Sequence, residues 1–208
     1  MVLVTFLIFI IYRLEQSQMS KSRIEAFTDA VIAIIMTLLV LELHTPGDPT
    51  WGAFLDMSHK FIVYLVSFVN LAIYWNNHHH LFQLVEKIDG RVLWANNFFL
   101  FTLTLFPYIT AWAGEYPFAW PPEALYGFIM LGANFSYYLL IQSLVKVNGE
   151  DSKIGQLFRS YPKLYLSSGL LIVAIIVGKL VAPIAVLIIN ALTLLMWFIP
   201  EKAVERIL

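Results

Sequence analysis

The only histidine cluster in the chain is a run of three neighbours, His78, His79 and His80. Adjacent residues on a helix point about 100° apart, so three in a row cannot converge on one metal ion, whose helical ligands lie three or four residues apart. The run therefore predicts a polar helix end and no metal site. The chain has no cysteine, which excludes thiolate chemistry and disulfides. We expect no cofactor and no enzymatic activity, because no acid, base or nucleophile cluster has catalytic spacing.

Asp29 is an acidic residue inside an otherwise apolar segment. It follows Arg23 by six residues, about 9 Å along a helix axis. A charge at the centre of a bilayer costs about 2.5–3.5 kcal/mol, so such residues normally face a bundle interior and a partner. The candidate partners at the same depth are His78, His79, Asn96 and Asn97. The residues alone leave two interpretations open, a structural polar clamp between helices and an ion or proton pathway.

An apolar stripe follows Asp29 on the same segment. Ile34, Leu38 and Leu41 fall at about 0°, 40° and −20° around a helix of 100° per residue. Nearly every membrane helix carries such a stripe. Taken alone, it indicates contact with lipid or with a protein core.

The composition decides which class of protein must position these residues. The chain has 208 residues, of which 60% are hydrophobic and 13% charged, against about 45–50% and about 25% in an ordinary soluble domain. So little charge cannot coat a soluble surface, so most of the chain must contact lipid or lie inside a bundle. The net charge of −1 argues against a nucleic-acid partner.

Apolar runs separated by prolines, glycines and charged loops predict an all-α integral membrane protein with six transmembrane helices. The expected helices cover residues 23–43, 54–87, 92–112, 122–147, 162–178 and 181–199. They form one transmembrane domain, residues 21–200. We expect residues 1–20 to be a leader or an interfacial segment, and residues 201–208 a cytoplasmic tail.

The distribution of basic residues orients the bundle. Eleven of the thirteen Lys and Arg lie at the two ends and in alternate loops, and the exceptions are Lys60 and Lys179. This positive-inside bias predicts that both termini are cytoplasmic. Aromatic residues gather at the opposite helix ends, as an interfacial belt requires: Trp51, Trp112, Tyr116 and Trp120. We therefore expect a multi-pass protein of the cell membrane, plasma or inner.

The first predicted helix carries a recognisable pattern. Its residues Arg23-Ile-Glu-Ala-Phe-Thr-Asp29 resemble the first-helix signature of the lysosomal-type potassium channels, the transmembrane protein 175 family, in which Arg is followed after three residues by Phe-Ser-Asp. Thr28 stands where the family usually has Ser, and the hydroxyl is kept. The segment 75–82 looks like the end of the second helix of that family, and residues 95–97 and 103–107 look like its third helix. The similarity covers about residues 21–200, although the last three helices match only as apolar segments.

The resemblance implies a passive potassium-selective channel. A chain with one set of six helices is expected to assemble as a homotetramer, with membrane lipid around it and potassium as the permeating ion. Its first helix would line the pore. The apolar constriction begins five residues after the Asp, at Ile34, and continues at Leu38 and Leu41. Such a ring gates by dewetting, and Thr37 is a candidate polar contributor.

The resemblance also assigns a structural polar network that anchors the first helix. Its members would be Arg23, Phe27, Thr28 and Asp29, with a histidine and an asparagine from His78, His79, Asn96 and Asn97.

Two other functions compete with a channel. A proton-coupled transporter would use Asp29 and a histidine as a relay, but secondary transporters usually show paired repeats and broken helices, and neither is visible. A membrane enzyme or lipid-binding scaffold is the third hypothesis.

Overall fold

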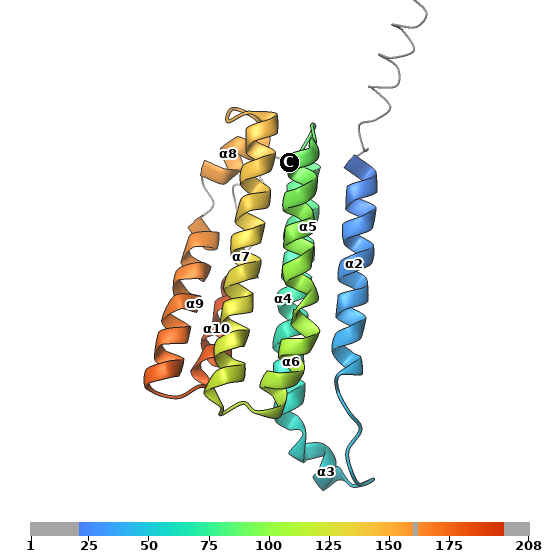
Figure 1. Cartoon of the computed structure of the whole chain (residues 1–208), viewed down its shortest axis with the longest axis vertical. Helices are drawn as coiled ribbons and strands as arrows, with labels where there is room; N and C mark the ends of the chain where they lie inside the picture. The colour runs from blue at the N-terminus through green and yellow to red at the C-terminus, as the bar shows by residue number, and fades with distance from the viewer. Residues whose placement is uncertain (1–20, 160–161, 198–208) are drawn as a thin grey trace, which may run out of the picture.

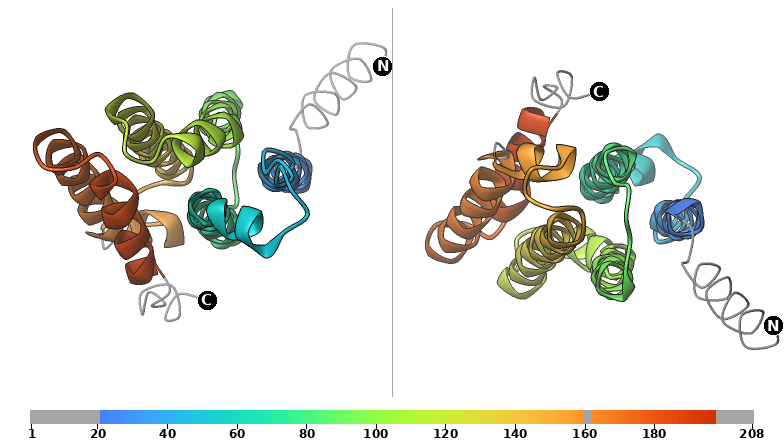
Figure 2. Two further views of the ribbon diagram at one scale, coloured as in Figure 1. Left: turned by 90° about the horizontal axis from the view of Figure 1, so that it is seen from below. Right: turned by 90° about the horizontal axis from the view of Figure 1, so that it is seen from above.

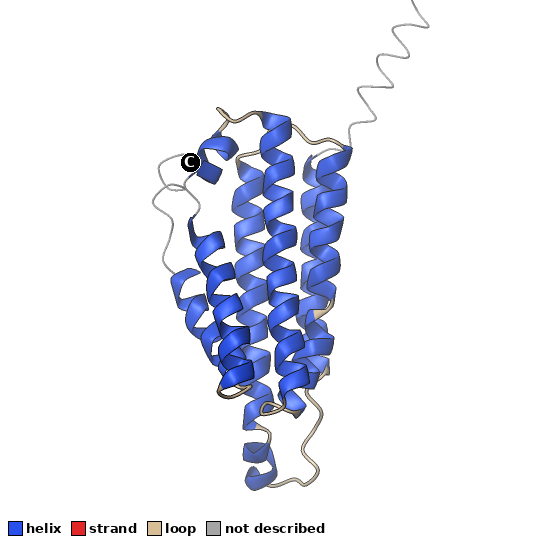
Figure 3. Cartoon of the chain, turned by 60° about the vertical axis from the view of Figure 1, so that its left-hand side comes forward, coloured by secondary structure: helices blue, strands red, loops and turns tan. Residues whose placement is uncertain are grey.

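The structure is a computed structural model that describes residues 21–159 and 162–197, and these form helices and no strand (Figures 1 and 3). In chain order the helices are α2 (Lys21–Leu41), α3 (Trp51–Asp56), α4 (Ser58–Gln83), α5 (Gly90–Thr104), α6 (Phe106–Glu115), α7 (Trp120–Asn148), α8 (Lys153–Arg159), α9 (Pro162–Leu180) and α10 (Ala185–Trp197). The predicted leader, residues 1–20, and the predicted tail, residues 201–208, lie outside the described residues.

The second predicted helix, residues 54–87, is divided in the structure. The short α3 begins after Thr50, whose Oγ1 accepts a hydrogen bond from Ala53 N at 3.2 Å, and Met57 separates it from α4. A hydroxyl at this position satisfies one of the free amides of a first helical turn. The helix α4 ends at Gln83, so the expected extension to residue 87 was wrong.

The third predicted helix, residues 92–112, consists of α5 and α6 with only Leu105 between them. Pro107 explains the break, because it has no N–H to continue the ladder of α5, and it lies in the first turn of α6 where no such bond is needed. The two pieces together make an apolar rod of 26 residues.

The segment 153–159 was predicted as part of a charged loop, but it forms the helix α8. Ser152 begins it, since its Oγ accepts from Gly155 N at 3.2 Å. Seven residues are too few to show helical periodicity in a sequence, and the serine cap was the only signal available.

Four helical rods are long and apolar enough to cross a bilayer: residues 21–41, 90–115, 120–148 and 162–180. The apolar helix α10 is shorter, and α4 is long, with 26 residues, but more polar. The chain is therefore an integral membrane protein by the length and composition of its helices.

The long helices form one bundle, with α2 at one edge and α9 and α10 at the other (Figures 1 and 2). The helix α2 packs against α4, α5 and α6, whereas α7 contacts both α5 and the α9–α10 pair. Aromatic rings pack together in the centre: Tyr74 lies edge-on against Phe99, at 5.6 Å between ring centroids, and against Phe106, at 6.3 Å.

The connection between α4 and α5 is held by a side chain from the end of α7. Asn148 Oδ1 accepts from the backbone N–H groups of Glu86 and Lys87, at 3.1 and 2.9 Å. Its Nδ2 donates to the carbonyls of Lys87 and Leu144, at 3.0 and 2.9 Å. One amide thus satisfies backbone groups of a connection that lies about 60 residues earlier in the chain.

Both exceptions to the charge bias have a partner at the end of the bundle opposite the first turn of α2. Lys60 forms an ion pair with Glu115, and the ammonium of Lys179 lies 5.1 Å from the ring centroid of Trp120. A paired charge and a cation over an aromatic face are stabilised locally.

Candidate functional site

The helix α2 has two faces of different character. One face packs against the rest of the subunit and consists of Ile24, Thr28, Ile32, Ile35 and Leu39. The predicted stripe lies on the other side, where Ile34 is 58% exposed, Leu38 42% and Leu41 73%. Large apolar side chains that the chain itself leaves uncovered are expected to contact lipid, another protein chain or an ion path.

A buried hydrogen-bonded chain connects α2 with α5 and α4. Asn96 Nδ2 donates to Thr28 Oγ1 at 2.9 Å, and His78 Nε2 donates to Asn96 Oδ1, also at 2.9 Å. All three side chains are at most 1% exposed. Buried polar groups are costly unless they are hydrogen-bonded, so this chain fixes how the three helices fit together.

The imidazole of His78 is also held by aromatic stacking. Its ring lies nearly parallel to Phe82, at 4.3 Å between centroids, and to Phe99, at 6.1 Å. The structure thus joins one of the two candidate histidines and one of the two candidate asparagines to Thr28. The other candidates, His79 and Asn97, are exposed, because the next residue on a helix points about 100° away.

Asp29 has a partner that the sequence did not predict. Trp75 Nε1 donates to Asp29 Oδ1 at 2.8 Å, and the indole stacks on His79 at 6.0 Å between centroids. Gln83 in turn is hydrogen-bonded to His79 at 3.0 Å. In the described part of the chain no hydrogen bond joins Asp29 to an imidazole, which is the contact that a proton relay would need.

The remaining members of the predicted network lie elsewhere. Arg23 forms no ion pair with any described residue, so the expected contact with Asp29 is not formed within one subunit. Six residues of helix separate the two by about 240° and 9 Å, which places them on different faces. Phe27 is 55% exposed and lies on the same side of α2 as Ile34.

Thr37 is exposed beside the stripe, and its hydroxyl donates to the carbonyl of Ile34 at 2.8 Å. The hydroxyl proton is thereby used within the helix. The lone pairs of Thr37 Oγ1 remain on the exposed side of α2.

A second buried polar cluster, away from α2, was missed by the sequence analysis. Thr110 Oγ1 donates to Ser67 Oγ at 2.7 Å, and Ser67 Oγ lies 3.1 Å from Tyr126 Oη. Tyr74 Oη donates to Asn134 Oδ1 at 2.6 Å. The available signal was the recurrence of Ser67, Asn70, Tyr74 and Asn77 on one face of α4.

This second cluster borders a cavity of about 30 Å³ between α4, α7, α9 and α10, large enough for a water molecule. Nearby, Glu123 is fully buried, and its Oε2 accepts from Leu187 N at 3.2 Å. The described residues hold no group of three or more His, Asp and Glu side chains that could bind a metal ion.

A bundle of apolar helices tied by a buried Thr–Asn–His chain defines an all-helical membrane protein. The sequence model of the family described as "Endosomal/lysosomal potassium channel TMEM175" matches residues 23–107. This match covers α2 to α5 and the start of α6, which are the elements that carry the chain of hydrogen bonds.

Similarity to individual proteins extends beyond residues 23–107. A protein of Chryseobacterium sp. named as a potassium channel is 40% identical over 188 residues, which is 90% of this chain and 97% of the relative. A mouse protein named "Endosomal/lysosomal proton channel TMEM175" is 33% identical over 101 residues, covering 46% of this chain and 20% of its own length. The chain therefore belongs to the TMEM175 family.

A solved structure shares the fold. The crystal structure titled as a lysosomal potassium-selective channel TMEM175 homolog from Chamaesiphon minutus superposes with a TM-score of 0.69, covering 86% of this chain and 96% of that one. Its sequence identity is 24%, so the comparison establishes the arrangement of helices alone.

Proposed function

We propose that the protein is a passive potassium-selective channel of the cell membrane, assembled as a homotetramer around four copies of α2. The observation that carries this proposal is the exposed apolar stripe of Ile34, Leu38 and Leu41 on a helix whose opposite face is buried. One helix cannot enclose a pore, so the ion path needs several subunits. The bacterial relative named as a potassium channel supports the choice of ion.

The stripe gives the pore its gate. Over about 10 Å of axis, four copies of Ile34, Leu38 and Leu41 make three stacked apolar rings. A narrow apolar tube loses water readily, and an ion inside it would lose hydration without replacement. Ile34 lies nearest the polar end of α2 and is the narrowest ring. Thr37 contributes a hydroxyl oxygen beside the rings.

The buried hydrogen bonds have a structural role in this mechanism. Thr28, Asn96 and His78 hold the rotation of α2 relative to α4 and α5, and therefore hold the stripe toward the axis. Asp29 acts as a fixed acceptor for Trp75 and stays outside the conduction step. This division favours a passive channel over a transporter with an Asp29–histidine relay.

The topology completes the proposal. Six crossings are made by α2, α4, α5 with α6, α7, α9 and α10, and both termini are cytoplasmic. The protein needs no cofactor, catalyses no reaction and binds no nucleic acid. Potassium and membrane lipid are its partners.

Potassium and sodium flux from liposomes containing purified protein tests the gate. We expect Ile34→Asn to wet the narrowest ring, raise cation flux and reduce the preference for potassium, with smaller effects for Leu38→Asn and Leu41→Asn. Val40→Asn is the matched control, since Val40 is 48% exposed but lies about 120° away from Ile34 around α2.

Two results would refute the proposal. Unchanged selectivity in all three stripe variants, with folded protein, removes α2 from the pore. A flux that requires a proton gradient and vanishes in Asp29→Asn would instead establish the transporter.

A further inference from the structure

A cavity of about 530 Å³ lies between the end of α7, the loop that follows it, and α8. Its polar lining consists of two cations, one carboxylate and one amide: Lys146, Arg159, Glu150 and Gln142. Val145 and Phe158 form its apolar wall. We propose that this cavity binds the phosphate-bearing headgroup of an anionic phospholipid. The inference requires that α7 spans the membrane, but it does not depend on which ion the protein conducts.

The length of α7 places the cavity at the depth of lipid phosphates. Tyr138 and Lys146 lie 18 and 26 residues beyond Trp120, which corresponds to about 27 and 39 Å along the helix. The hydrocarbon core is about 30 Å thick, and about 40–45 Å with the headgroups. With Trp120 at one interface, Tyr138 reaches the other edge of the hydrocarbon and Lys146 reaches the headgroup layer.

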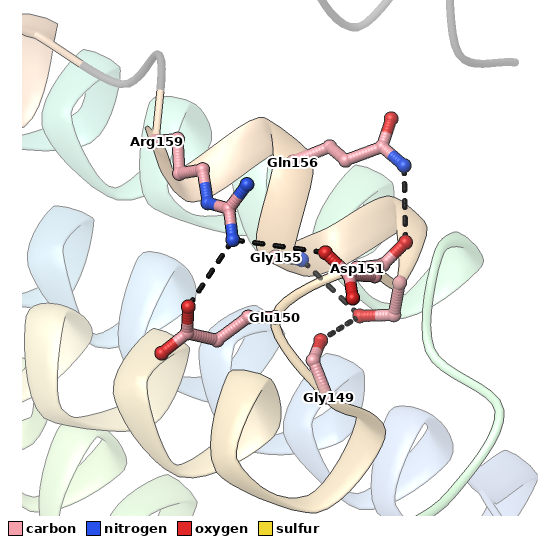
Figure 4. A network of polar contacts seen from close by, with 7 residues as sticks. Gly149, Glu150, Asp151, Gly155, Gln156 and Arg159 are labelled. Carbon is pink, nitrogen blue, oxygen red and sulfur yellow. Dashed lines mark hydrogen bonds and ion pairs between the residues drawn. The ribbon is translucent and has the colours of Figure 1, made fainter.

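The two cations are available to an anionic ligand. Lys146 is exposed and forms no ion pair or hydrogen bond with another described residue. Arg159 uses a single nitrogen, Nη2, for both of its ion pairs, at 3.1 Å to Glu150 and 3.7 Å to Asp151 (Figure 4). A guanidinium has five N–H donors, so its other nitrogens remain free to bind phosphate oxygens.

The two acidic neighbours of Arg159 are weak competitors. Their side chains are 80% and 100% exposed, and exposed ion pairs contribute little because water and salt screen them. Paired N–H groups of an arginine match the geometry of a phosphate group. A phosphate can therefore share or replace these carboxylates at Arg159.

Aromatic side chains lie next to the cavity, on the side of the hydrocarbon layer. Tyr138 packs against Phe158 of α8, at 5.8 Å between ring centroids, and against Tyr165 of α9, at 6.1 Å. Gln142 Nε2 donates to Tyr138 Oη at 2.5 Å. Tyr165 is 56% exposed, so an acyl chain attached to a bound headgroup has an apolar surface to follow. A free phosphate would make no use of that surface.

Two glycines give the cavity its shape. Gly149 has φ of +96°, a conformation that side chains other than glycine rarely adopt. A Cβ on Gly155 would lie 2.2 Å from the carbonyl oxygen of Glu150. The loop and α8 therefore pack backbone to backbone at Gly155, close to the two cations that line the cavity.

Native mass spectrometry of the purified protein in detergent tests the proposal with phosphatidylglycerol, phosphatidylcholine and inorganic phosphate. We expect retained phosphatidylglycerol but not phosphatidylcholine. One basic residue near a membrane contributes about a fivefold change in affinity, so Lys146→Gln should lower phosphatidylglycerol retention about fivefold and the double variant with Arg159→Gln about 30-fold. Lys153→Gln is the matched control, because Lys153 lies on α8 outside the cavity lining.

Several outcomes would overturn the site. Equal loss in Lys153→Gln would indicate a general electrostatic attraction, and equal retention of the two lipids would exclude recognition of charge. Release of the lipid by millimolar inorganic phosphate would assign the cavity to free phosphate. If the double variant does not fold, Lys146→Glu alone decides the question, since unchanged phosphatidylglycerol retention with reversed charge contradicts the proposal.

Discussion

Asn96 on α5 donates to Thr28 on α2 over 2.9 Å, inside the bundle. This bond sets the rotation of α2, because a turn by a single residue, about 100°, would carry Thr28 away from the amide. The same turn would move Ile34 from the exposed side toward the subunit core. The position of the proposed gate therefore depends on a hydroxyl six residues earlier in the chain.

Thr28→Val tests this coupling. The change keeps the shape of the side chain but leaves Asn96 Nδ2 buried without an acceptor, which costs about 1–3 kcal/mol. We expect a lower free energy of unfolding, measured by denaturant titration in detergent, and potassium flux that varies between preparations of the protein. Thr28→Ser keeps the hydroxyl and should preserve the hydrogen bond. Equal stability of the two variants would show that the Asn96–Thr28 bond does not hold α2.

A second prediction concerns Asp29 and Trp75. Asp29→Asn keeps an oxygen acceptor for the indole N–H and should fold normally, whereas Asp29→Ala removes it and should cost about 1 kcal/mol. Trp75→Phe, which removes the donor, should make the Asp29→Ala change nearly neutral. A double-mutant cycle by thermal unfolding measures this. Fully additive losses would mean that the contact contributes nothing to stability.

Cysteine labelling can test the topology, because the chain has no cysteine of its own and only an introduced cysteine can react. Phe118 lies between α6 and α7 and is 77% exposed, so Phe118→Cys should react with an impermeant maleimide on intact cells. Glu150→Cys, at the other end of α7, should react only after permeabilisation. The reverse order of labelling would place both termini outside the cell.

The fourth prediction is the assembly. In the proposed channel four copies of α2 surround the pore at Ile34, Leu38 and Leu41, so we expect native mass spectrometry of the active protein to give a mass of about four chains. Detecting only monomers in a preparation that conducts potassium would contradict the shared pore. Leu41 is 73% exposed, so cross-linking through a cysteine introduced there gives an independent count of the chains in the assembly.

Much of the fold could be predicted because hydrophobicity determines membrane helices. The apolar runs predicted the long helices, but the break at Pro107 falls inside the helix expected over residues 92–112. The boundary at Leu105 and the seven residues of α8 depend on local hydrogen bonds, such as the Ser152 cap, whose signal in a sequence is short.

The sequence predicted Thr28 and the candidate histidines and asparagines of the polar network, but neither their pairing nor the contact of Asp29 with Trp75. Helical geometry places His78 and His79 about 100° apart, but only the packing of α4 against α5 decides which of them faces Asn96. The Trp75–Asp29 bond joins residues 46 positions apart and has no local signature. The buried set around Ser67 and Tyr126 was overlooked because hydroxyls scattered through apolar helices carry little weight in composition.

The hydrogen bonds between the Asn148 side chain and the α4–α5 connection have a consequence for the folding of the chain during synthesis. The backbone amides of Glu86 and Lys87 find their acceptor only in a residue synthesised about 60 positions later. Until the ribosome has delivered the whole of α7, water must solvate these two amides, and the hairpin of α4 and α5 stays loosely joined. Premature termination before Asn148 would therefore leave a fragment in which the backbone N–H groups of Glu86 and Lys87 have no side-chain acceptor.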